Sequence, residues 1–326
     1  MNKINYLQFT AVGGDAKIGL FTTTSPDVQY SFDGKNWVAW DYKAITIPDG
    51  STLFLNGNNP KGFSKGFPKY NFFMMQGKIE AHGNIMSLIY GEHCDSNLTI
   101  PNARCFECLF LVCDSLLTAP ELPATTLTER CYDSMFSGCR SLVEAPELPA
   151  TTLTERCYQF MFSGCRSLVE APELPAKELQ RECYWGMFDG CTSLIVAPEL
   201  PALNLADCCY SKMFKDCESL VEALELPSET LTLYCYGSMF EGCKSLEIAP
   251  LLPAQNLHRG CYRRMFFGCK SLQYVYALFE DKFHLISTKS WLYGVSKYGQ
   301  FVKSRRAKWN DTGTSGIPKG WRWVQV

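Results

Sequence analysis

The sequence predicts an α/β solenoid, in which stacked coils with one short strand and one short helix each lie between an N-terminal all-β domain and a C-terminal cap. A 26-residue pattern recurs seven times between residues 105 and 276 without insertion or deletion. Repeats of one fixed length bury their apolar faces against their neighbours, as solenoids do. The segment before the repeats alternates like β-strands, and the segment after them breaks the period.

The N-terminal residues 1–83 are expected to form a small, sandwich-like domain, of the Ig-like kind. The stretch VQYSFDGKNWVAW alternates and turns after Asp33, which is a strong hairpin signal, and KAITIPDGSTLFLNG is a second strand-turn-strand with its turn at Asp49. Trp37 and Trp40 are candidates for stacking on a sugar, although hairpin aromatics usually pack across strands. Both interpretations stay open at this point.

The solenoid is expected over residues 84–276, as a degenerate first coil followed by seven units. Each unit begins with a cysteine and an aromatic residue, first at Cys105 and Phe106, and carries a second cysteine eight residues later. This register predicts a structural ladder of sulfur-bearing and aromatic side chains. The ladder includes Cys131, Met135, Phe136, Cys139, Cys157, Cys165, Cys183 and Cys191.

Each unit is expected to hold one strand and one helix. SLVEAPELP suits a brief strand that begins at Leu142 and ends at the prolines, which lack an N–H for the ladder. TLTERCYDSMFSG is typical of a helix, because Thr126 and Glu129 have the spacing of a capping box. From Cys131, apolar residues recur four and eight positions later, which would form one stripe on that helix.

The repeat text CYxxMFxGCxSLxxAPELPAxxL resembles the BspA-like bacterial leucine-rich repeats over residues 105–276. A 26-residue period also lies within the range of about 20 to 29 residues that is typical of leucine-rich repeats. The resemblance implies a leucine-rich-repeat stack and a surface or binding protein without enzymatic activity. The ending FVK…W…GIP.GW.V is similar to the segment that closes such proteins in gut anaerobes and their bacteriophages.

The seventeen cysteines could form disulfides, bind zinc or supply a catalytic nucleophile, or they could simply fill the core as buried thiols. Disulfides are disfavoured because eight helical residues rise about 12 Å, too far for a bridge. Zinc needs four converging ligands, and the one C-x-x-C pair, Cys105 and Cys108, has no second pair in register. Many equivalent thiols argue against a single nucleophile. We therefore expect small buried thiols with no metal and no cofactor, and the redox state of Cys94, Cys108 and Cys208 stays open.

An acidic row is the main candidate for binding. One glutamate recurs just after each strand, and a second, partial row contains Glu144, Glu170 and Glu222. The first row consists of Glu121, Glu147, Glu173, Glu199 and Glu225. A row of charges is usually a solvated face, and the alternative is a groove for a basic partner or a divalent cation. Tyr274 and Tyr276 lie where the row gives way to apolar and aromatic residues, and they are candidate docking residues.

The tail, 277–326, is expected to cap the last coil. It carries 9 basic and 3 acidic residues, whereas residues 105–276 carry 13 basic and 22 acidic ones. Its tryptophans lie among basic residues, a pattern that can bind single-stranded nucleic acid. Tryptophans that cover the last coil explain the pattern more simply, and the overall charge of −2 gives no general attraction to nucleic acid, so we expect no nucleic-acid partner.

The sequence contains no nucleophile elbow, phosphate loop or zinc-protease motif, so no enzyme is predicted. We expect a non-enzymatic recognition or adhesion protein that presents a rigid surface to a protein or glycan partner. The alternative is a structural virion component, such as a phage tail fibre or decoration protein, which would form an oligomer. No apolar run is long enough to span a membrane and no signal peptide is seen, which fits cytoplasmic assembly before exposure on a cell or virion.

Overall fold

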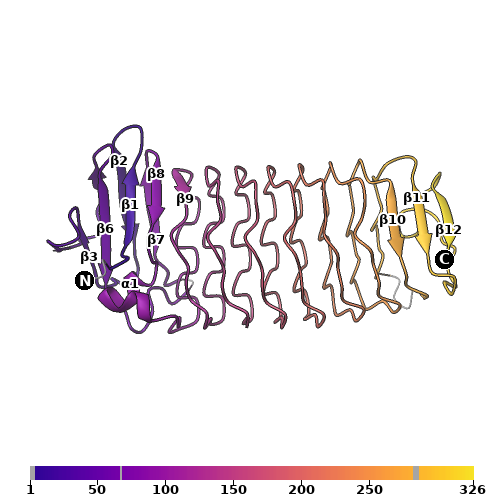
Figure 1. Ribbon diagram of the computed structural model, residues 1–326, viewed down its shortest axis with the longest axis horizontal. Helices are drawn as coiled ribbons and strands as arrows, with labels where there is room; N and C mark the ends of the chain where they lie inside the picture. The colour runs from indigo at the N-terminus through magenta and orange to yellow at the C-terminus, as the bar shows by residue number, and fades with distance from the viewer. Residues whose placement is uncertain (1–3, 67, 282–285) are drawn as a thin grey trace.

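The computed structural model describes residues 4–66, 68–281 and 286–326. The chain forms a straight rod, with β-sheets at each end and a long run of stacked coils between them (Figure 1). Helix is confined to α1 (Ser87–Tyr90) and the 3₁₀ helix η1 (Gly91–Ser96) in the described part of the chain. Neither helix has the length and apolar character that crossing a membrane requires.

Two sheets build the N-terminal end. The strands are β1 (Leu7–Ala11), β2 (Ala16–Phe21), β3 (Val28–Ser31), β4 (Val38–Ala39), β5 (Ile45–Ile47), β6 (Thr52–Gly57), β7 (Phe72–Gln76), β8 (Ile79–His82) and β9 (Leu116–Thr118). One sheet has the order β4-β3-β6-β1-β8-β9 and the other has the order β5-β2-β7. The sheets share a core in which Phe9 of β1 packs edge-to-face on Phe73 of β7, with ring centroids 5.3 Å apart.

The two turns predicted in this region have different outcomes. β3 and β4 pair antiparallel around the Asp33 turn, as the hairpin signal predicts. β5 and β6 flank the Asp49 turn, but they lie in different sheets and do not pair with each other. This strand-turn-strand therefore connects the two sheets, and its residues Ile47 and Leu53 are both fully buried.

The N-terminal sheets continue directly into the repeats. β9 lies in the first repeat and pairs in parallel with β8, so the larger sheet extends past residue 83. The backbone N–H of Phe73 donates to the carbonyl of Leu109 at 2.8 Å, and that of Ser64 donates to the carbonyl of Cys105 at 2.9 Å. One continuous apolar core results, with no break between the sheets and the first coil.

The prediction of a helix in each coil, and with it the α/β fold class, was wrong. From Thr128 to Cys139 the chain forms successive four-residue turns, in which every second N–H bonds within its own coil. The N–H of Cys131 donates to Thr128 O at 3.2 Å, whereas the N–H of Tyr132 donates to Cys157 O of the next coil at 3.0 Å. An α-helix would use all of these donors internally, so it could not join the coils by backbone bonds.

Left-handed residues make this turn series possible. They recur every four positions, at Arg130, Ser134 and Gly138, with φ values of 53°, 55° and 78°. A non-glycine residue in this conformation costs about 1–2 kcal/mol. Hydrogen bonds to the next coil, such as the one from the Ser134 N–H to Gln159 O at 2.8 Å, offset part of that cost.

The strand predicted in each unit is reduced to single parallel bridges in the middle of the rod. Thr118 bridges Glu144, and Val196 bridges both Glu170 and Glu222. A regular sheet reappears only at the C-terminal end, where β10 (Tyr274–Ala277), β11 (Gln300–Lys303) and β12 (Arg322–Gln325) pair in parallel. In the coils where a proline follows two residues after the bridge, such as Pro146 after Glu144, the missing N–H removes a donor that would extend the ladder.

The core of the coils consists of two aromatic columns and the cysteines beside them. Tyr132, Tyr158 and the equivalent tyrosines stack with ring centroids 5.8–6.2 Å apart. Phe136, Phe162 and the equivalent phenylalanines stack at 5.6–5.7 Å. The ladder residues predicted from the register are all fully buried. Because each coil presents the same rings to the next, neighbouring coils stay in register.

Candidate binding face

The acidic row lies on one long side of the rod. In the unit that begins at Cys131, Leu142 and Leu148 are buried and anchor the segment from both sides. Val143, Glu144 and Glu147 lie between the anchors and are exposed. The same order of buried and exposed residues recurs in the following units, so each exposed position forms a column along the rod.

One column of carboxylates has no partner among the residues that the structure describes. We call the surface around Glu147, Glu173, Glu199 and Glu225 the acidic face. None of these four side chains forms a hydrogen bond or ion pair with any residue that the structure describes. Glu121, at the N-terminal end of the column, differs because it accepts a hydrogen bond from Asn5 Nδ2 at 2.7 Å.

The carboxylates of the acidic face repel one another. Rings in successive coils are 5.6–5.7 Å apart, and backbones joined by parallel bridges beside the column lie about 4.8 Å apart, so neighbouring carboxylates are expected about 5–6 Å apart. Two like charges about 6 Å apart in water repel by about 0.7 kcal/mol. An external cation placed along the column would remove this repulsion.

Proline-walled grooves run between the coils of this face. One groove of about 680 Å³ has Glu121 and Glu147 at its edge. Another, of about 420 Å³, has Glu173 and Glu199 at its edge. The grooves are shallow and open, so they fit a chain that lies across the surface better than a small molecule that must be enclosed.

An exposed aliphatic column runs beside the carboxylates. Val143, Val169, Ile195 and Val221 are 41–52% exposed. The sequence interpretation did not include these residues, although they recur at the same 26-residue spacing as the glutamates. The face therefore combines a charged column with an apolar one.

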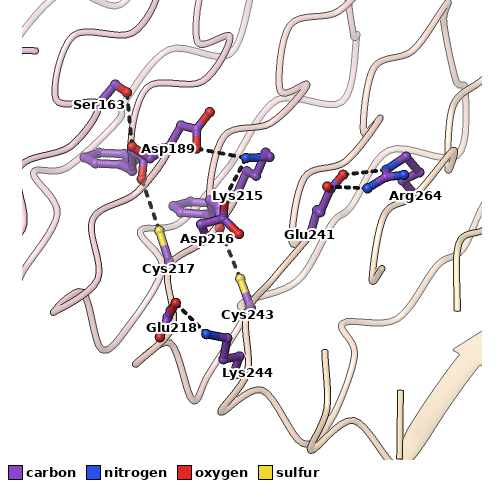
Figure 2. A network of polar contacts seen from close by, with 12 residues as sticks. Ser163, Asp189, Lys215, Asp216, Cys217, Glu218, Glu241, Cys243, Lys244 and Arg264 are labelled. Carbon is purple, nitrogen blue, oxygen red and sulfur yellow. Dashed lines mark hydrogen bonds and ion pairs between the residues drawn. The ribbon is translucent and has the colours of Figure 1, made fainter. Parts of the chain in front are cut away.

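The opposite, turn-bearing side of the rod pairs its charges (Figure 2). Arg264 donates to both carboxylate oxygens of Glu241, at 2.6 and 2.9 Å. Lys215 lies between Asp189 and Asp216, with Nζ to carboxylate oxygen distances of 3.6 and 2.5 Å. Unpaired carboxylates in a column are thus a property of the acidic face and not of the rod in general.

Fifteen of the seventeen cysteines are buried, Cys108 and Cys208 are partly exposed, and the second cysteine of a coil donates to a backbone carbonyl of the preceding coil. All seventeen fall within the described ranges, and each is a free thiol, including Cys94, Cys108 and Cys208. The thiol of Cys217 donates to the carbonyl of Phe188 in the preceding coil at 3.1 Å, and Cys243 bonds Phe214 in the same way (Figure 2).

The environment of the thiols opposes the thiolate form. Burial raises the pKa of Cys157 and of Cys235 to about 12. Since the thiolate is the form that attacks electrophiles and binds metals, these thiols are poor nucleophiles and poor ligands at neutral pH. The part of the chain that the structure describes also holds no group of three metal-ligating side chains.

The four aromatic candidates for binding differ in how far they are exposed and in where they lie on the rod. Trp37 is half-buried and packs edge-on against Tyr6, with centroids 4.9 Å apart. Trp40 is only 4% exposed and its Nε1 donates to Lys43 O at 2.9 Å, so its ring is not available to a ligand. Tyr274 and Tyr276 are half-buried in β10, beyond the end of the acidic face.

Comparisons with known proteins add no identification, because no family model, curated protein or solved structure gives a significant match to the chain. The resemblance to BspA-like repeats therefore rests on the repeat motif alone.

Proposed function

We propose that this chain is a non-enzymatic recognition protein whose acidic face binds an extended, basic segment of a partner protein. The observation that supports this most directly is the column of unpartnered carboxylates above proline-walled grooves. The charges on the turn-bearing side need no partner, because they already pair with one another.

The spacing of the acidic face fits an extended peptide. Alternate residues of an extended chain lie about 6.6 Å apart, somewhat more than the spacing of about 5–6 Å between coils, and long flexible cationic side chains can span the difference. Lysine or arginine at alternate positions could therefore meet successive carboxylates. Their aliphatic stems would cover the exposed column at Val143, Val169 and Ile195, as long cationic side chains do on apolar surfaces.

The test uses a peptide that alternates lysine and threonine, with binding followed by fluorescence anisotropy at low and high salt. The face variant is Glu147→Gln, Glu173→Gln and Glu199→Gln combined. The control combines Asp114→Asn, Glu129→Gln and Glu218→Gln, which removes the same charge at exposed carboxylates that are ion-paired within the protein.

We expect the unmodified protein to bind the peptide and the affinity to fall as salt rises. The face variant should bind about tenfold more weakly, since each of three exposed ion pairs contributes about 0.2–1 kcal/mol. The control should bind like the unmodified protein. Equal losses in both variants, or binding to a glycan that the face variant leaves intact, would argue against the acidic face as the binding surface.

From the resemblance to repeat proteins of gut anaerobes and their phages we also infer exposure at a cell or virion surface, with a structural virion component as the alternative. No observation on the described residues separates the two, so both stay predictions.

A further inference from the structure

The C-terminal end of the rod is an uncovered edge strand. β12 is the outermost strand of the sheet β10-β11-β12, and all four of its residues are exposed. It lies at the end of the rod furthest from the N-terminal sheets (Figure 1). Trp323 and Val324 are 44% and 43% exposed. An edge strand that combines free backbone groups with exposed apolar side chains is a template for pairing with another chain.

The N-terminal end is protected against such pairing. Its edge strands are both short, since β4 contains only Val38 and Ala39 and β5 of the second sheet contains only Ile45–Ile47. The loop before β4 is held by Asp33, whose Oδ1 accepts hydrogen bonds from the N–H groups of Lys35 and Asn36 at 2.9 and 2.8 Å. A very short edge strand is one way in which proteins prevent edge-to-edge association. The two ends of the rod therefore differ in their capacity to pair.

The hydrogen bonds of β12 determine which backbone groups face outward. The N–H of Arg322 donates to Gly299 O at 2.9 Å and the N–H of Val326 donates to Lys303 O at 3.1 Å, both toward the body of the rod. Backbone groups alternate in direction along a strand. The N–H and C=O groups of Trp323 and Gln325 therefore point to the open side.

We propose that two copies of this chain associate end to end through β12, as an antiparallel pair around a two-fold axis. Trp323 of each copy then lies opposite Gln325 of the other, and the two pairs exchange four backbone hydrogen bonds. Val324 lies on the axis and meets its own equivalent, a β-branched pair that stabilises strand contacts. The interface is self-complementary, as two-fold symmetry requires.

Charge opposes this association but does not prevent it. The segment 277–326 is basic, so the two ends repel each other. In the proposed register the two Arg322 side chains are four residue positions apart along the strand, or about 14 Å. This exceeds the screening length of about 8 Å at physiological salt. We therefore expect the association to strengthen as salt rises, the opposite of the salt dependence expected for a basic peptide on the acidic face.

Sedimentation velocity of the full chain over a concentration series tests the proposal. We expect the mass to double as concentration rises. Gln325→Pro removes an outward N–H at a position where an edge strand tolerates proline, and Val324→Lys places two ammonium groups on the axis. Each substitution should abolish the doubling while the circular dichroism spectrum and the melting temperature stay unchanged. The matched control Val38→Lys, on exposed β4, should dimerise normally.

Three results would overturn the proposal. The first is an unmodified chain that keeps the monomer mass at every concentration. The second is a dimer that persists in both β12 variants. The third is an association that Val38→Lys abolishes, since the N-terminal edge would then be the contact.

Discussion

Replacing Phe188 with alanine tests whether the aromatic columns hold the coils together. The ring is fully buried and lies 5.7 Å from the rings of both Phe162 and Phe214, with interplanar angles of 7° and 1°. Truncating a buried phenylalanine to alanine costs about 3–5 kcal/mol, and this site loses two stacked pairs as well as its volume. We expect the free energy of unfolding to fall by about 4 kcal/mol.

The loss should be greatest near the substitution, because each coil contacts only its neighbours. Urea unfolding gives the size of the effect and amide hydrogen exchange gives its location. The N–H groups of Phe162 and Phe188 donate to the next coil at 2.9 Å, so their exchange should accelerate, while β1 keeps its protection. Val169→Ala, at an exposed position, should change stability by less than about 0.5 kcal/mol. A loss below about 1 kcal/mol for Phe188→Ala, or faster exchange along the whole rod, would refute the reasoning.

Three further predictions concern charge, backbone and thiols. Burial raises the pKa of Asp133 to about 6, so the folded protein holds this proton more tightly than the unfolded chain and loses stability as pH rises from about 4 to about 6. Asp133→Asn should therefore stabilise the protein by up to about 3 kcal/mol at pH 7.5 and have little effect at pH 4. Urea unfolding of both proteins at pH 7.5 and at pH 4 checks this. A difference in unfolding free energy that is the same at both pH values would contradict it. Gly190→Ala, at a φ of 78°, should lower stability by about 1–2 kcal/mol, measured by chemical denaturation, and an unchanged midpoint would exclude backbone strain there. Alkylation at pH 8 should be slow in the native protein and should reach all seventeen cysteines after denaturation without reductant, whereas thiols that stay protected would indicate disulfides.

The sequence identified the positions of the coils better than their conformation. A 26-residue register places Cys131, Met135 and Cys139 inside, and all three are fully buried. The error concerned the backbone between them. A spacing of four residues is compatible with a helix of 3.6 residues per turn and also with a series of four-residue turns. Arg130 and Ser134 decide between the helix and the turn series, because both adopt the left-handed conformation. Neither arginine nor serine is a residue type that signals this conformation in a sequence.

The candidate site was also only partly visible in the sequence. The column from Glu121 to Glu225 could be found from its period, but the pairing state of each carboxylate depends on which side chains the coils bring alongside. Glu121 has a partner in Asn5, more than a hundred residues earlier, whereas Glu147 has none among the described residues. Trp40 shows the same limit, since its hairpin was predicted correctly but the sequence left open whether its ring packs inside or meets a ligand.

Equivalent positions in successive coils carry alternating charges on the turn-bearing side of the rod and the same charge on the acidic face. On the turn-bearing side, one position changes from Asp189 to Lys215 to Glu241 in successive coils, so the charge alternates and neighbours attract. On the acidic face, the equivalent position stays glutamate in coil after coil, so repulsion adds up along the column. A sequence that needed only to fold could alternate its charges on both sides. On the acidic face the charges do not alternate, so a cation from outside the chain would lower the repulsion between the carboxylates. This is why we propose recognition on that face.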